Sequence, residues 1–178
     1  MYRPLFALPV LAASSWSVAQ EPPAVDLVAR LMAGAADQAW IFTDYLLAKL
    51  EQTGPGAFVG DSSGERLELS VTEPETCIFD LSTTFAGSNP GRVRLDARAL
   101  TSVSYRTSET VELEVTLTGY FVTLEGGPDL LTLPDSTGAD GRPQVAPREL
   151  YWMTSLELAA LEGALRDLQT LHCPPSGT

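Results

Sequence analysis

The central part of the chain alternates between apolar and polar residues, and this period of two constrains the fold more than any other feature. Leu67, Leu69 and Val71 are separated by charged or polar residues. The same alternation holds for Val93, Leu95 and Ala97, and for Val111, Leu113, Val115 and Leu117. Because successive side chains of a strand point to opposite faces, such runs are typical of an antiparallel sheet that buries one face. We expect roughly six or seven antiparallel strands, which form an open sheet or a barrel.

Helices are expected on either side of this region. In the segment 24–52, apolar residues recur at steps of three and four, which predicts one long amphipathic helix that ends before Gly54. Its polar face carries more acidic than basic side chains, so packing on the core is preferred to a role as a partner or membrane-surface helix. Residues 154–157 have the spacing of a capping box, and the leucines in 158–171 then predict a C-terminal helix packed on the sheet. The fold class is therefore α+β.

The N-terminus has the features of a secretory signal peptide. A basic residue precedes the apolar stretch 5–13, and small residues stand at the third and the first position before a cleavage point at Gln20. The apolar stretch is shorter than the roughly 20 residues that span a bilayer, so we expect removal of residues 1–19 and no transmembrane segment afterwards. Residues 20–178 then form a single mature domain that is periplasmic or secreted.

The chain has two cysteines, Cys77 and Cys173. Export to an oxidising compartment favours a disulfide bond between them, and a pair of buried free thiols is the alternative. Neither cysteine has a second cysteine nearby in the sequence, and His172 is the single histidine, so a zinc site is excluded by spacing.

The charge of the chain is strongly acidic. It has 23 acidic and 11 basic residues and a formal net charge of −12, which repels the phosphates of nucleic acids. We therefore expect no nucleic-acid partner. Arg92, Arg94 and Arg98 share one face of a predicted strand, and cross-strand ion pairs with Glu112 and Glu114 are the preferred interpretation. The alternative is an anion site that the three arginines line.

The motifs that could support catalysis are weak. Residues 60–64 resemble the Gly-Asp-Ser sequence of serine hydrolases, but His172 lies far downstream, in an order that the known triads do not use. A turn between two strands is preferred for this segment. Residues 135–141 contain two aspartates, but Thr137 and Ala139 stand where a calcium loop needs Asp or Asn. No phosphate-binding loop occurs, and we expect no catalytic residue, no cofactor and no metal.

Two further regions are ambiguous. Residues 125–148 are rich in glycine, proline and polar side chains and are expected to form a long loop, either mobile or functional, before a short strand at 150–153. Aromatic residues also gather in this half of the chain, and core packing is preferred for them over the lining of a pocket. They are Tyr105, Tyr120, Phe121, Tyr151 and Trp152.

The order of the predicted elements from Cys77 to Cys173 resembles that of small bacterial extracytoplasmic domains with a pleckstrin-homology-like fold. The resemblance implies a run of antiparallel strands that one amphipathic helix closes. The chain departs from the lipid-binding members because the basic loop that grips inositol phosphates is missing. Between Phe58 and Gly91 the sole basic residue is Arg66.

These features favour an exported, non-catalytic binding or interaction protein of the cell envelope, whose partner is an envelope protein or a small apolar ligand. The alternatives are a hydrolase that uses carboxylates and a carrier of a small apolar ligand; the oligomeric state stays open. We expect no pair of acidic side chains to face a common cleft at the spacing of glycosidases. The best pocket should be apolar or lie where the N-terminal helix meets the sheet.

Overall fold

The computed structural model describes residues 21–43, 46–62, 64–85, 91–112 and 115–174. Its strands form one antiparallel sheet of eleven strands in the order β10-β9-β6-β5-β4-β3-β2-β1-β11-β8-β7. The strands are β1 (Trp40–Thr43), β2 (Leu46–Gly54), β3 (Ala57–Ser62), β4 (Glu65–Glu75), β5 (Ile78–Phe85), β6 (Gly91–Asp96), β7 (Leu100–Glu112), β8 (Thr116–Gly126), β9 (Leu131–Thr137), β10 (Pro143–Val145) and β11 (Glu149–Thr154).

Two short α-helices accompany the sheet. They are α1 (Ala24–Ala33) and α2 (Leu158–Asp167), and α2 continues into the turn η2 (Leu168–His172). A further turn, η1 (Ala97–Ala99), joins β6 to β7. Helix α1 packs on β4, β5 and α2. None of the helices in the described ranges is long and apolar enough to cross a membrane.

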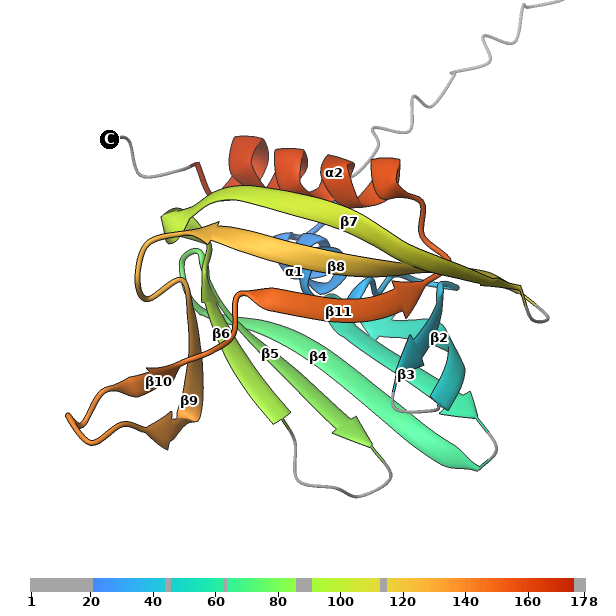
Figure 1. Cartoon of the computed structure of the whole chain (residues 1–178), viewed down its shortest axis with the longest axis horizontal. Coiled ribbons are helices and arrows are strands. Elements are labelled where there is room, and N and C mark those ends of the chain that lie inside the picture. The colour runs from blue at the N-terminus through green and yellow to red at the C-terminus, as the bar shows by residue number, and fades with distance from the viewer. Residues whose placement is uncertain (1–20, 44–45, 63, 86–90, 113–114, 175–178) are drawn as a thin grey trace, which may run out of the picture.

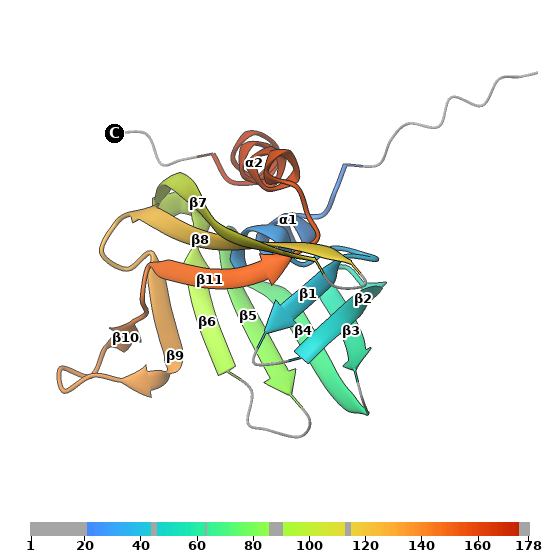
Figure 2. The ribbon, with the colours of Figure 1, turned by 45° about the vertical axis from the view of Figure 1, so that its right-hand side comes forward.

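The sheet is strongly curved, and α1 lies on its concave side (Figures 1 and 2). The strands β7, β8 and β11 cross over the strands β4, β5 and β6 (Figure 1). Helix α2 lies beside β7, the edge strand, and packs on α1 (Figures 1 and 2). The concave face carries the core, which includes the fully buried Leu67, Phe79 and Val122 from three different strands and Leu27 and Val28 from α1. The curvature therefore places one apolar surface around a single helix.

The expected fold is wrong in its strand number, its N-terminal helix and its pleckstrin-homology-like architecture. The sheet has eleven strands rather than six or seven, and the segment 24–52 is divided into α1, β1 and most of β2. Gly34 ends the helix because it adopts a left-handed φ of 61°, and the N–H groups of Gly34 and Ala35 donate to the carbonyls of Arg30 and Ala29. This pair of bonds is a Schellman motif, which terminates the helix at the glycine.

The region 125–148 is not a single long loop. It contains the end of β8, all of β9 and β10, and the turn between the last two. Strand β9 is held by pairing with β6, where Leu131 lies opposite Leu95. Both leucines are buried, so a tertiary contact extends the sheet through a segment whose composition is typical of loops.

The alternating run from Val111 to Leu117 is also divided. Strand β7 ends at Glu112 and β8 begins at Thr116, so the run covers the end of one strand and the start of the next, and Val111 lies opposite Leu117. Its middle residues, 113 and 114, lie outside the described residues.

The expected capping box does not form at the start of α2. The N-cap residue is Glu157, and it makes no side-chain capping bond. The Thr154 hydroxyl donates instead to the Gly34 carbonyl, 2.8 Å away, and accepts from the N–H of Leu156. The Ser155 hydroxyl accepts from the backbone N–H of Trp40. The Thr154 hydroxyl therefore links the end of β11 to the residue after α1, and the Ser155 hydroxyl links the residue after β11 to the start of β1.

Candidate functional site

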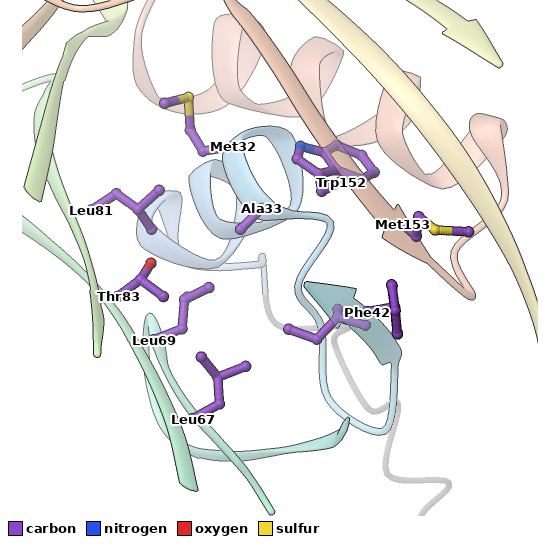
Figure 3. A pocket seen from close by; sticks show the side chains of 10 residues that line it. Met32, Ala33, Phe42, Leu67, Leu69, Leu81, Thr83, Trp152 and Met153 are labelled. Atoms are coloured by element: carbon purple, nitrogen blue, oxygen red, sulfur yellow. The ribbon is translucent and has the colours of Figure 1, made fainter. Parts of the chain in front are cut away.

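An apolar cavity of about 130 Å³ lies between the C-terminal end of α1 and the concave face of the sheet. Figure 3 shows its walls, to which α1, β1, β4, β5 and β11 contribute. The residues that line it are Met32, Ala33, Ile41, Phe42, Leu67, Leu69, Leu81, Thr83, Trp152 and Met153. Its place at the junction of helix and sheet is the one expected from the sequence.

The local sequence explains why space is left here. The last residue of α1 is Ala33, whose methyl group reaches only a short way toward the sheet. Because Gly34 then turns the chain toward β1, no further helical turn covers the strands below. Leu67 and Leu69 on β4 lie opposite Phe85 and Thr83 on β5. Leu67 and Leu69 line the space beyond the end of α1, which the helix does not fill.

None of the ten lining residues has an ionisable side chain. The polar atoms on the lining side chains are the Thr83 hydroxyl and the indole nitrogen of Trp152. Trp152 is only 7% exposed, and its Nε1 is buried without a hydrogen-bond partner among the described residues. The cavity thus suits a largely apolar molecule, and one of its lining side chains, Trp152, has a buried N–H donor without a partner among the described residues.

The Trp152 ring is fixed by its neighbours. A Cβ at Gly34 would lie 2.8 Å from two carbons of the indole, so the glycine permits the ring to pack against the backbone. The ring centroid of Tyr120 lies 5.3 Å from that of Trp152, and the Tyr120 hydroxyl donates to the Leu156 carbonyl. The Trp152 ring is therefore held between Gly34 and Tyr120.

The three arginines of the candidate anion site lie in ion pairs within the chain. Arg94 donates two hydrogen bonds to the buried carboxylate of Asp80, at 2.6 and 2.8 Å. Arg92 bridges Asp80 and Asp135, and Arg98 pairs with Asp96. The Arg94 guanidinium holds the pKa of Asp80 below its ordinary value, although burial opposes the shift.

The expected pairing of these arginines with Glu112 does not occur, because β6 and β7 are not neighbours in the sheet. Glu114 lies outside the described residues. The structure brings Arg92 and Arg94 together at Asp80, while Arg98 belongs to the separate turn η1. An anion site at these arginines stays a prediction, and an anion there would compete with Asp80 and Asp135.

The disulfide between Cys77 and Cys173 is confirmed, with a Cα–Cα distance of 5.6 Å. It joins the turn after β4 to the residue that follows η2. Glu73 also lies close to both sulfur atoms, and its carboxylate accepts from the backbone N–H of Cys77. Because the bond uses both thiols, this group has no thiolate to offer a metal ion.

Ser62 and His172 are not brought together. Ser62 pairs with Glu65 at the first residue of β4, whereas the carbonyl of His172 contacts Cys77, just beyond the last residue of that strand. An extended strand of this length spans roughly 30 Å. The His172 ring instead contacts the Pro22 carbonyl through Nε2. The backbone positions of Ser62 and His172 therefore do not favour a serine–histidine pair, and residue 63 lies outside the described residues.

Three acidic side chains line one open hollow beside Gln52, and they are Glu21, Asp26 and Asp37. The expectation that no acidic pair faces a cleft at the spacing of glycosidases stays a prediction. Asp26 accepts hydrogen bonds from the N–H of Gly56 and from the Gln52 side chain, and Asp37 accepts from the N–H of Gln52. The last bond lowers the pKa of Asp37. A general acid needs a raised pKa, which Asp37 does not have. Asp26 and Asp37 both accept hydrogen bonds from the backbone of the β2–β3 hairpin.

Of the five aromatic residues noted in the sequence, Trp152 alone is among those that line the cavity. Its partner across the sheet is Tyr120, whereas Tyr151 pairs with Phe121, so the two pairs lie on opposite faces. The alternation within 150–153 is the signal that could have separated them.

No protein-family model, no curated protein and no solved structure matches this chain, so its function has to be argued from the cavity itself.

Proposed function

We propose that the protein is an exported, non-catalytic binding protein of the cell envelope that holds the apolar part of a small ligand in the cavity between α1 and the sheet. One observation carries this proposal: a cavity of about 130 Å³ whose lining has no ionisable side chain. An apolar cavity of roughly 150 Å³ is known to stay dry and to bind benzene. The cavity therefore has the size and the chemistry to take a six-carbon fragment.

The expected affinity of such a fragment is modest. Each buried methylene contributes about 0.8 kcal/mol, so a six-carbon ring gains on the order of 5 kcal/mol. This corresponds to a dissociation constant on the order of 1 mM or somewhat lower. A natural ligand that binds more tightly would extend from the cavity, which is partly open, along the apolar side chains of β4 and β5.

Export is supported by the signal-like features of residues 1–19 and by the disulfide, a bond that is favoured outside the cytoplasm. Residues 1–20 themselves lie outside the described residues. Protein recovered from the periplasm or the medium should begin at Gln20 by N-terminal sequencing and by intact mass. Recovery of a chain that begins at Met1, and only from the cytoplasm, would contradict export.

Cyclohexane is a suitable probe of the cavity because it is apolar and close to benzene in size. In a methyl-labelled sample, we expect saturable shifts of the methyl signals of Met32, Leu69 and Leu81, which line the cavity. The methyl signals of Leu158 and Leu171 should not move, because these exposed leucines lie elsewhere. Uniform small shifts at all five residues without saturation would contradict a specific site.

A further inference from the structure

The buried indole nitrogen of Trp152 is unexplained by the packing of the protein. Its N–H group has no hydrogen-bond partner among the described residues, although the side chain is more than nine-tenths buried. Buried donors in folded proteins almost always have a partner, because an unpaired donor loses its hydration without compensation. A donor without a partner in a side chain that lines a cavity points to a molecule that supplies the acceptor.

The surroundings of the nitrogen show how an acceptor could reach it. Figure 3 shows the nitrogen on the edge of the ring that faces Met32, which also lines the cavity. The opposite edge of the indole is packed against Gly34. The nitrogen atom is not exposed to the empty cavity, so an acceptor reaches it only when a lining side chain moves. Met32 and Met153 both line the cavity, and methionine is unbranched and adapts its conformation easily.

The remaining lining restricts the chemistry of that acceptor. None of the ten lining residues carries a charge, so a carboxylate or phosphate inside the cavity would be buried without a counterion at high cost. The protein as a whole has a net charge of −12, which further disfavours an anion. A neutral oxygen acceptor on an apolar body meets both conditions.

Resting on the proposed function, we propose that the cavity is specific for neutral carbonyl compounds, such as ketones or esters with a short hydrocarbon body, and that Trp152 Nε1–H donates a hydrogen bond to the carbonyl oxygen. Trp152 is then a specificity-determining residue. It selects a carbonyl compound over a hydrocarbon of the same shape.

Cyclohexanone and cyclohexane test this proposal because they differ by one carbonyl group. For each probe, the free energy of transfer between water and hexadecane is subtracted from the free energy of binding. The corrected affinities then do not include the difference in hydrophobicity between the two probes. The wild-type protein should bind cyclohexanone more than about tenfold more tightly than cyclohexane on this scale, because the carbonyl has no hydrogen-bond partner in hexadecane and gains one in the protein. In the wild-type protein, the indole N–H proton signal of Trp152 should move downfield with cyclohexanone and stay in place with cyclohexane.

The variant Trp152→Phe removes the donor and retains an aromatic ring, so it should bind both probes with equal corrected affinity. Trp40→Phe is the matched control, because Trp40 is not among the lining residues, and it should keep the preference. Equal corrected affinities in the wild type, with no shift of the indole proton, would overturn the carbonyl assignment and leave the proposed function standing. A persistent contact of the indole proton with water in the presence of cyclohexanone would also overturn it. Failure of both probes to bind would overturn both proposals.

Discussion

At the scale of single residues, Asp80 is the one buried carboxylate among the described residues. It is 7% exposed and accepts three hydrogen bonds from Arg92 and Arg94. Because its pKa is lowered in the folded protein, its stabilisation is present above the unfolded pKa of about 4 and is lost as the pH falls through the folded value. Asp80→Asn should lower the free energy of unfolding by about 2 kcal/mol at pH 7, with a smaller difference below about pH 4.

Denaturant titrations of the wild type and the variant at several pH values measure this difference. The control is Asp135→Asn, because Asp135 pairs with Arg92 on the exposed surface and should contribute less than about 1 kcal/mol. A difference for Asp80→Asn that stays constant from pH 7 to pH 3 would show that its carboxylate does not act through its charge.

A second residue-scale prediction concerns Gly34. Alanine there would keep a left-handed φ of 61° and would place its Cβ 2.8 Å from Trp152. Gly141 has a φ of 79°, and no atom lies within 4 Å of the position that a Cβ would take there, so Gly141→Ala tests the backbone strain alone. We expect a loss of about 1 kcal/mol for Gly141→Ala and about 3 kcal/mol for Gly34→Ala, measured by chemical denaturation. Equal losses would show that the contact with Trp152 has no cost.

At the scale of elements, the disulfide connects the β4–β5 turn to the C-terminal end of η2. The sequence separation of 96 residues gives the closed loop a large entropy in the unfolded chain. The double variant Cys77→Ser/Cys173→Ser should be less stable by about 3 kcal/mol and keep its far-UV circular dichroism, because the core does not depend on the bond.

Amide hydrogen exchange shows which elements lose stability in the Cys77→Ser/Cys173→Ser variant. We expect amides of α2 and η2 to lose more protection than those of β4 and β5, because the bond anchors the end of the helical segment. An unchanged exchange profile, or loss of all secondary structure, would each contradict this account.

The sequence predicts these elements unevenly, and the reasons are physical. The alternation of Leu67, Leu69 and Val71 identifies β4 correctly, because these three residues are buried on one face of the strand. The two cysteines could be paired because the chain has no others. Periodicity failed in the segment 24–52, where apolar residues are dense enough to fit a helix, and the αL turn at Gly34 decides the outcome.

Other features depend on contacts between distant segments. Strand β1 is fixed by β11, which lies more than a hundred residues later, and β9 by β6. The cavity arises from the curvature of the whole sheet around a helix that ends early. A window of local sequence contains none of this information, so the position of the cavity was predictable but its lining residues were not.

At the scale of the whole molecule, ligand binding should weaken when the cavity becomes smaller. Ala33 lines the cavity from α1, so Ala33→Leu should fill much of the space without a loss of stability. Ala159 is exposed on α2, and Ala159→Leu adds the same atoms to a helix outside the cavity.

The most direct test is a titration of the wild type and these two variants with cyclohexane, followed by calorimetry or by the methyl signals of Leu69 and Leu81. We expect the wild type and Ala159→Leu to bind with the same affinity, and Ala33→Leu to bind at least about tenfold more weakly while it remains as stable as the wild type. Equal binding by all three proteins, or no saturable binding by the wild type, would contradict the assignment of the cavity as a ligand site.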